Sequence, residues 1–573
     1  MKKSSLVITL IIIIWTLYHS VFLSLNEILK IADSFAYLQM SHYIWELSQK
    51  WLGNWWFGFV YSLPIALGEL FLTDWFLAAK LINLILFGVS SVLLWKIARK
   101  FLDIHYAYFV IILFYLSPTL LHFNIHVLSE NIYIPLFLWV FLIILNFQEK
   151  LRYFYLCYNE WNNKPISIKE WNSNTYKYVI YIACLLWLMY LTRAEAFIYL
   201  LSIGIISITF LYKKYLSTLN FLKLAIVFLL SFFLFISPYI FHLHSLTGGW
   251  GLTNKWASNL RQAELRGVEH MSDAGFEQAV AELTDDKTQL IAGFAWGMDY
   301  VKPQIDGSLK EFISKDPSAF ISRVLQNQKK LFTKNLPEIF LGKSPSLYYS
   351  DDRRFSHIAF LIFCMIPIVV LIYGIYSFYR NEKYFLWISW AFFLPALIFF
   401  TLFFTLNRYF LIFLPLILIA FVYGVQSIKK NIMLSGLIRI FLISNIILIF
   451  LLSTSVYYNI ESPKDEYYAL KQEAGEWLWE NRSELKIMER FPIVTYYANS
   501  KSRYITPYTE DIGDMYEYGI YNDIDILVVD SMDFQTYRPR LVRYLEETPQ
   551  DFSLLKKFEN NKWQKVILYK LEK

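Results

Sequence analysis

Charge and cysteine are both scarce in this sequence. Charged residues make up 17% of the 573 positions, whereas a soluble domain carries roughly a quarter. The three cysteines are too few and too scattered for a disulfide framework or a cysteine-rich metal cluster. The sequence also lacks a glycine-rich phosphate loop and an internal repeat. These absences argue against a large soluble protein and a nucleotide-binding domain, and nothing in the composition indicates nucleic acid.

Apolar residues, in contrast, make up 56% of the chain and gather in long runs with little charge. A helix needs about 20 mostly apolar residues to cross a bilayer, so about 11 transmembrane helices are predicted. They are predicted at 6–25, 78–97, 106–121, 132–147, 178–192, 195–212, 222–241, 357–378, 384–404, 409–426 and 436–457. Met1-Lys2-Lys3 precedes the first run as in a signal sequence, but no small-residue cleavage site follows. We therefore interpret this run as an uncleaved first transmembrane helix.

Lysine and arginine are concentrated on alternate connections between the predicted helices. They lie at Lys2-Lys3, Lys96/Arg99/Lys100, Lys150/Arg152 to Lys177, Lys213/Lys214/Lys223, Arg380/Lys383 and Lys429/Lys430. By the positive-inside rule these connections face the cytoplasm of a multi-pass plasma (inner) membrane protein. The regions 26–77 and 242–356 and the C-terminal tail are then extracytoplasmic. The predicted domains are a transmembrane domain at 1–459 and a soluble extracytoplasmic domain at 460–573.

The C-terminal tail has the pattern of a small α/β domain. From Ile460 onward it contains 16 Lys and Arg against 21 Asp and Glu, although the whole chain carries a net charge of +6. Apolar residues at helical spacing predict an amphipathic helix at 465–482. Buried strands are predicted at 491–497 and 524–530, and the alternation at 565–571 is typical of an edge strand.

Several charged residues lie at the predicted outer membrane boundary, where an acidic group is costly unless it has a partner or a function. Asp33 follows the first span and precedes a helical pattern. It is either an N-cap or first-turn acid, or a general base that takes a proton from an acceptor hydroxyl. Glu130 has the same structural alternative, as an acid in the first turn of a helix.

Two arginines lie at the same predicted boundary. Arg193 and Glu195 either pair with each other or face lipid headgroups, and Arg408 is a candidate interfacial anchor. The topology, however, places Asp33, Glu130 and both arginines on one side, where they are expected to converge on a cavity. The planar guanidinium fork suits a phosphate group. The constellation therefore fits transfer from a phosphate-linked donor held in the membrane.

With these motifs the chain resembles the GT-C class of membrane glycosyltransferases, in the bacterial branch akin to protein O-mannosyltransferases and the lipid A aminoarabinose transferase. The matching motifs are Asp33-Ser34-Phe35-Ala36-Tyr37-Leu38, Ser129-Glu130-Asn131, Leu191-Thr192-Arg193-Ala194-Glu195-Ala196, Ser237-Pro238-Tyr239 and Asn407-Arg408-Tyr409-Phe410-Leu411-Ile412-Phe413-Leu414-Pro415. Each motif is short, and the resemblance rests on their order, spacing and sidedness across nearly the whole chain. The tail, with Glu476-Trp477-Leu478, is similar to the soluble domain of that branch.

The resemblance implies a polytopic α-helical protein with the GT-C fold and an extracytoplasmic active site. The implied activity is inverting transfer of a hexosyl or pentosyl group from a polyprenyl-phosphate sugar donor to a lipid, glycan or protein acceptor. Asp33 would be the catalytic base, and Arg193 and Arg408 would bind the donor phosphate. Glu130, Glu195, Tyr37 and Lys255 are the further candidate substrate-binding or supporting residues.

The chain also departs from the family pattern. Many relatives have a second acid directly after the first-loop aspartate, where this chain has Ser34. Some relatives use a divalent metal ion, for which Glu130, His242 and His244 are candidate ligands. The string at 296–300 does not match the Trp-Trp-Asp-Tyr-Gly signature typical of oligosaccharyltransferases. Transfer of a single sugar is therefore favoured over transfer of a whole oligosaccharide.

Two other functional classes stay open at this stage. A transporter or flippase of lipid-linked glycans would favour inverted repeats and broken helices at the middle of the membrane. An O-antigen ligase or polymerase would also use a lipid-linked sugar, but it is not expected to combine Asp33 after the first helix with this tail. A non-catalytic homologue is a further alternative.

Overall fold

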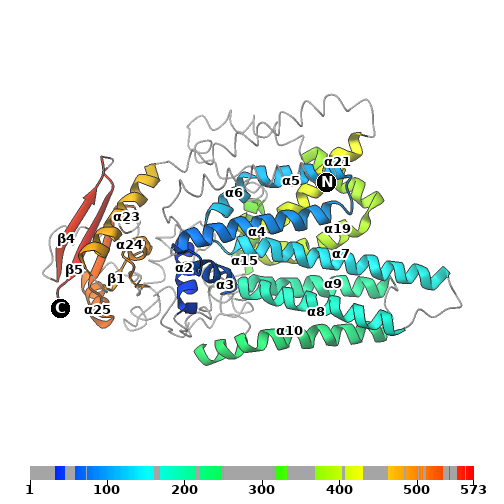
Figure 1. Cartoon of the computed structure of the whole chain (residues 1–573), viewed down its shortest axis with the longest axis horizontal. Coiled ribbons are helices and arrows are strands. Elements are labelled where there is room, and N and C mark those ends of the chain that lie inside the picture. The colour runs from blue at the N-terminus through cyan, green and yellow to red at the C-terminus, as the bar shows by residue number, and fades with distance from the viewer. Residues whose placement is uncertain are drawn as a thin grey trace. The chain divides into compact units, whose positions relative to one another are not determined.

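The computed structural model contains two compact units. It describes residues 32–45, 59–72, 74–160, 168–213, 218–247, 250, 314, 317–331, 368–402, 407–429, 463–482, 485–500, 503–504, 506, 511–532, 534, 541–542, 551–561 and 563–573 (Figure 1). The first unit takes its described residues from Gly58–His242 and Asn327–Tyr457. The second takes them from Asn26–Phe57, Leu243–Gln326 and Tyr458–Lys573.

The first unit is a bundle of long helices. Its helices are α3 (Ser62–Glu69), α4 (Trp75–Ala98), α5 (Ile104–Leu116), α6 (Pro118–Ile125), α7 (Glu130–Glu160), α8 (Ile168–Thr192), η2 (Ala194–Phe197), α9 (Ile198–Tyr212), most of α10 (Thr218–Thr247), a helix at 368–381, α19 (Lys383–Leu402), α20 (Asn407–Phe410), η4 (Leu411–Phe413) and α21 (Leu414–Lys429). Within the bundle, α7 packs against α4 and α8, α9 against α19, and α21 against α5 (Figure 1).

Many of these helices are long and apolar enough to cross a membrane. Within the described residues there are seven, at Trp75–Ala98, Glu130–Tyr153, Thr175–Thr192, Ala194–Tyr212, Thr218–His242, Lys383–Leu402 and Arg408–Ile428. An eighth is present if Ile104–Leu116 and Thr119–Ile125, bent by 59°, form one span. The predicted spans 6–25 and 436–457 lie outside the described residues, as does the first half of 357–378. The multi-pass helical architecture is confirmed, whereas the predicted number of helices is not tested.

The break between α5 and α6 has a local cause. Ser117 has an extended backbone, and its hydroxyl accepts a hydrogen bond from the Leu120 N–H at 3.4 Å. Pro118, the first residue of α6, has no N–H and favours the start of a helix. The Ser-Pro pair therefore ends one helix and begins the next within a single predicted span.

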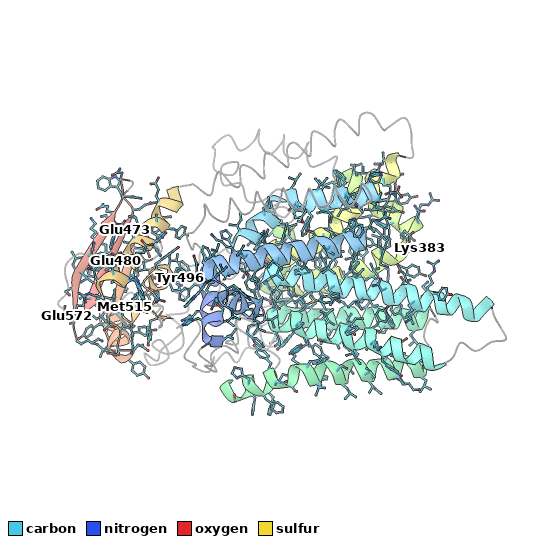
Figure 2. The ribbon with its side chains drawn as sticks, viewed as in Figure 1. Lys383, Glu473, Glu480, Tyr496, Met515 and Glu572 are labelled. Atoms are coloured by element: carbon cyan, nitrogen blue, oxygen red, sulfur yellow. The ribbon has the colours of Figure 1, made fainter. Side chains whose placement is uncertain are left out.

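Basic residues gather at one end of the bundle. Lys100 after α4 pairs with Glu149 of α7 at 2.6 Å, and the Arg152 guanidinium lies 5.5 Å from the ring centroid of Tyr384 in α19. Lys383 lies at the same end, where α19 begins (Figure 2). Connections that are predicted to face the cytoplasm thus lie close to one another at this end of the bundle. Their cytoplasmic orientation stays a prediction.

The second unit contains the C-terminal α/β domain. Its elements are α23 (Pro463–Asn481), β1 (Ile487–Met488), α24 (Ile493–Tyr497), β2 (Arg503–Tyr504), α25 (Ile512–Tyr521), β3 (Ile526–Asp530), β4 (Phe552–Glu559) and β5 (Lys565–Leu571). The strand order is β2-β1-β3-β5-β4; β1 pairs in parallel with β2 and β3, and β5 pairs antiparallel with β3 and β4. The unit also contains α2 (Ala32–Trp45) and most of α15 (Pro317–Lys330).

The core of this domain lies on both faces of the sheet. Ile526 and Val528 of β3 pack in one buried cluster with Leu470 of α23, and Leu527 packs in a second cluster with Met515 of α25. The alternation follows from the two-residue period of a strand. All five residues of β3 are buried, as expected for a central strand covered by a helix on each face.

The sequence-based prediction for the tail is partly correct. Helix 465–482 and strand 524–530 correspond to α23 and β3. The strand predicted at 491–497 is wrong, because this segment turns and forms α24. The edge position predicted for 565–571 is also wrong, because β5 lies between β3 and β4 and the edge strands of the described sheet are β2 and β4. Period-two alternation shows that one face of a strand is buried, but it does not reveal whether the strand has one neighbour or two.

Candidate active site

The predicted site residues Glu130, Arg193, Glu195 and Arg408 lie together in the first unit, each at or near a helix end. Glu130 is the first residue of α7. Arg193 separates α8 from η2, with an extended backbone at φ −150° and ψ 119°. Arg408 is the second residue of the short helix α20. The helix ends bring together residues that are far apart in the sequence.

These four side chains form an ion-pair network. The Arg193 guanidinium donates to Glu130, and its Nε lies 3.7 Å from Glu195 Oε2. The Nε of Arg408 lies 3.9 Å from Glu130 Oε1. Glu130 thus contacts both arginines. The network contains two positive and two negative groups, so its charges compensate one another.

Burial differs sharply between the two arginines. The side chains of Arg193 and Glu130 are 7% and 1% exposed, whereas that of Arg408 is 30% exposed. Two ions removed from water cost several kcal/mol each unless the partner and further hydrogen bonds compensate. Arg193 is therefore held by its carboxylates, while the guanidinium of Arg408 is more accessible to a ligand.

Three tyrosines surround the network. The Tyr409 ring lies beside both guanidinium groups, with centroid distances of 5.3 Å to Arg193 and 5.9 Å to Arg408. The Tyr133 ring lies 5.8 Å from the Arg193 guanidinium, and its hydroxyl is hydrogen-bonded to Tyr199. A π-face near a desolvated cation is stabilising. The motifs alone predict no role for these tyrosines, although Tyr133 lies three residues after Glu130, on the same helix face.

Buried amides fix the turn that precedes Glu130. The Asn83 side-chain amide of α4 donates to the carbonyl oxygens of Asn124 and His126, at 3.1 and 2.9 Å. Asn131 donates to His126 as well, at 2.9 Å, and the Tyr61 hydroxyl donates to Asn83 Oδ1 at 2.5 Å. Because amide side chains satisfy the main-chain carbonyls of this buried turn, the start of α7 is held against α4.

Asp33 and Tyr37 lie on α2, in the second unit. Asp33 is the second residue of this helix, and its side chain lies outside the part of the chain that the structure describes. Tyr37 is 5% exposed. The position of Asp33 in the first turn of α2 is compatible with both of its predicted roles, a first-turn acid and a general base. Its catalytic role therefore stays a prediction.

The remaining predicted residues do not form a metal site in the described part of the chain. The His242 ring lies 6.5 Å from that of Tyr239, and His244 stacks on Trp250 at 3.9 Å. Lys255 lies outside the described residues. Among the residues that are described, no group of three or more His, Cys, Asp or Glu side chains is arranged to hold a metal ion. The candidate ligands are therefore not assembled there, and metal binding stays a prediction.

Comparison with known proteins gives matches at the level of structure. No protein-family model matches the sequence, and no curated protein matches it either. The Archaeoglobus fulgidus oligosaccharyltransferase in its apo form matches with a TM-score of 0.50 and 12% identity, covering 87% of this chain and 65% of that chain. The structure of the same enzyme tethered to an acceptor peptide with an NVT sequon matches with a TM-score of 0.50 and 10% identity, covering 90% of this chain and 66% of that chain.

The chain has a GT-C fold. This confirms the fold predicted from the sequence motifs. The chain spans about two thirds of the length of the archaeal enzyme, 65% in the apo structure. ArnT from Cupriavidus metallidurans bound to undecaprenyl phosphate is also similar, with a TM-score of 0.47, 9% identity and coverage of 98% of this chain and 97% of that chain. At these identities the likeness concerns the fold, and a fold does not by itself determine an activity.

Proposed function

We propose that this GT-C protein is an inverting glycosyltransferase that moves one sugar from a polyprenyl-phosphate donor to a lipid, glycan or protein acceptor. The observation that carries the proposal is the network of Arg193, Arg408 and Glu130 at the ends of apolar helices. A guanidinium pair at that position suits a phosphate whose lipid tail lies among the helices. The predicted orientation places this chemistry on the extracytoplasmic side of the plasma membrane.

The two arginines have different roles in this proposal. Arg408 is more exposed and lies 3.9 Å from Glu130, so it turns to the donor phosphate at a small cost. Arg193, buried between Glu130 and Glu195, supplies a fixed positive charge behind it. As the sugar leaves, negative charge develops on the phosphate oxygen, where pre-positioned cations are most effective.

The reaction is a single displacement. The acceptor oxygen forms a bond to the anomeric carbon while the bond from that carbon to the phosphate oxygen breaks. Asp33 takes the acceptor's proton on the opposite face of the sugar, which gives inversion. The polyprenyl phosphate leaves as an anion facing the arginines. No step in this scheme is assigned to a metal ion.

The decisive experiment is sugar transfer in proteoliposomes from radiolabelled polyprenyl-phosphate sugars. Asp33→Asn should abolish transfer while donor binding persists, and Arg408→Ala should raise the KM for the donor. Glu149→Gln removes a carboxylate from the opposite end of the bundle and serves as the control with unchanged transfer. An Asp33→Asn variant as active as wild type would refute the base and return Asp33 to a first-turn acid. Movement of the donor across the bilayer without transfer would instead support a flippase.

A further inference from the structure

Helix α2, which carries Asp33, packs against helix α24 of the C-terminal domain. Phe35 of α2 and Tyr496 of α24 meet edge to face, with ring centroids 6.2 Å apart and planes at 87°. Tyr496 is labelled in Figure 2. This is a favoured geometry for an aromatic pair. Phe35 is 4% exposed, and every residue from 34 to 41 is buried. The contact therefore lies two residues from Asp33, on a helix that is buried on all sides over two turns.

Helix α24 is held at both ends by polar groups of its own domain. The Glu489 carboxylate accepts hydrogen bonds from the N–H groups of Val494 and Thr495, at 3.2 and 3.0 Å. After the helix, Asn499 adopts a left-handed conformation with φ 48°, and the Ser500 hydroxyl donates to the Leu485 carbonyl at 2.7 Å. A five-residue helix has little stability of its own, so these contacts determine where it lies.

The carboxylate at the start of α24 belongs to a buried charge network. Lys471 of α23 lies 3.4 Å from Glu489 and 3.2 Å from Asp530 at the end of β3. The Tyr467 hydroxyl donates to Asp530. The side chains of all three charged residues are fully buried. A buried network in which each charge has a partner rigidifies its surroundings, so α24 is tied to both α23 and the central strand.

A glycine allows α24 to lie directly on α23. A Cβ at Gly475 of α23 would be 2.5 Å from Tyr497 Cβ and 2.7 Å from the Val494 carbonyl oxygen. No real Cβ tolerates such contacts with backbone atoms. Any side chain at position 475 would therefore move α24, and Tyr496 with it, through a substitution on α23.

We propose that α24 orients α2 and thereby Asp33, with Tyr496 as a positioning residue, so that the C-terminal domain contributes to catalysis without touching the donor. The inference rests on the proposed function, because it assigns α24 a role toward the predicted base. A displacement of about 1 Å at a reacting group is enough to lower a rate by roughly 100-fold.

The test compares Tyr496→Ala, Tyr496→Phe and Gly475→Ala in the full-length protein. Tyr496→Ala and Gly475→Ala should lower kcat by roughly 10- to 100-fold at an unchanged KM for the donor. Tyr496→Phe keeps the ring and should retain activity. Gly513→Ala is the control on α25 and should behave as wild type, because this position is exposed and its Cβ would lie near only one described atom, the Asp511 Oδ1 at 3.1 Å.

Hydrogen exchange separates this inference from the proposed function. Peptides covering 32–45 should exchange faster in Tyr496→Ala and Gly475→Ala, whereas peptides covering β3 and β5 should stay protected. If wild type transfers no sugar from any donor, the proposed function fails and exchange alone decides whether α24 orders α2. Unchanged exchange of 32–45 in both variants, or loss of kcat in Tyr496→Phe equal to that in Tyr496→Ala, would overturn the inference.

Discussion

Asn83 of α4 donates its side-chain amide to the main-chain carbonyl oxygen of His126 at 2.9 Å, in the turn that leads to Glu130. The same carbonyl accepts from Asn131 of α7. Two amides from two helices thus converge on one acceptor. The position of the ion-pair network therefore depends on an uncharged hydrogen-bond cluster behind it.

Replacing Asn83 with alanine should destabilise the bundle. The change leaves the carbonyls of Asn124 and His126 and the Tyr61 hydroxyl without this partner, at a cost of about 1–3 kcal/mol for each group that stays buried and unpaired. Thermal unfolding in detergent measures the effect. Ser90→Ala is the control, because the Ser90 hydroxyl donates within its own helix, to the Leu86 carbonyl oxygen at 2.9 Å. Equal melting temperatures for the two variants would contradict the role of Asn83.

The ion-pair network predicts unequal effects of replacing Arg193 and Glu130, two of its three buried members. Arg193→Gln leaves the Glu130 and Glu195 carboxylates near each other, and breaking a buried pair in this way costs roughly 3–5 kcal/mol. Glu130→Gln should cost less, because Arg193 keeps Glu195 at 3.7 Å. The double variant should be more stable than the sum of the single effects predicts, by about 0.5–3 kcal/mol. Additive shifts in a thermal double-mutant cycle would show that the pair is not coupled.

The helix at 368–381 and helix α21 cross so closely that a side chain is not expected to fit at the two glycines of the crossing. A Cβ on Gly374 of the helix 368–381 would overlap the Ala420 carbonyl oxygen of α21, and one on Gly424 would overlap the carbonyl of Val370. Small residues permit such approach between membrane helices. Each glycine-to-alanine variant should therefore lose about 1–3 kcal/mol.

Two other glycines supply matched controls for this crossing. A Cβ on Gly88 or Gly204 would meet nothing within 4 Å, so alanine at these positions should leave the melting temperature unchanged or raise it. All four variants are compared by thermal unfolding in the same detergent. A Gly374→Ala protein as stable as Gly88→Ala would mean that the two helices separate at little cost.

The buried Glu489 predicts a pH dependence of α24. Burial raises the pKa of this carboxyl above its ordinary value of 4.5, against the opposing effects of Lys471 and the N–H groups of Thr495 and Val494. The folded domain then binds this proton more tightly than the unfolded chain does. The contribution of Glu489 to stability is therefore fully present below pH 4.5 and is lost as the pH rises through the raised pKa.

Hydrogen exchange of residues 485–500 across a pH series, corrected for intrinsic exchange rates, measures this dependence. Protection of wild type should fall from pH 4.5 upward, and Glu489→Gln should remove that part of the slope. Glu476→Gln changes an exposed carboxylate of α23 and should keep the wild-type slope. Equal slopes in wild type and Glu489→Gln would show that this carboxyl does not couple proton binding to folding.

Local sequence was sufficient for some elements and insufficient for others. The sequence predicts helix α23 because its apolar residues recur with the 3.6-residue period of a helix. It predicts strand β3 because its apolar residues form a nearly continuous run. Both patterns can be read within the segment itself. The segment 491–497 has the β-branched and aromatic residues of a strand, yet it forms α24. Its helical N–H groups are satisfied by Glu489 and its close fit depends on Gly475, so tertiary contacts override the local preference.

The sequence by itself determined that this chain crosses a membrane several times and that Glu130, Arg193 and Arg408 lie at or near helix ends. Both properties depend on the free energy of transferring side chains from water to lipid. Each segment contributes this free energy through its own residues, independently of the rest of the fold. Only the tertiary structure decided that Arg193 pairs with Glu130 as well as Glu195, that Arg408 is the more exposed arginine, and that the helix carrying Asp33 packs against α24. Those pairings join residues far apart in the chain, and they depend on how whole helices pack rather than on any local pattern.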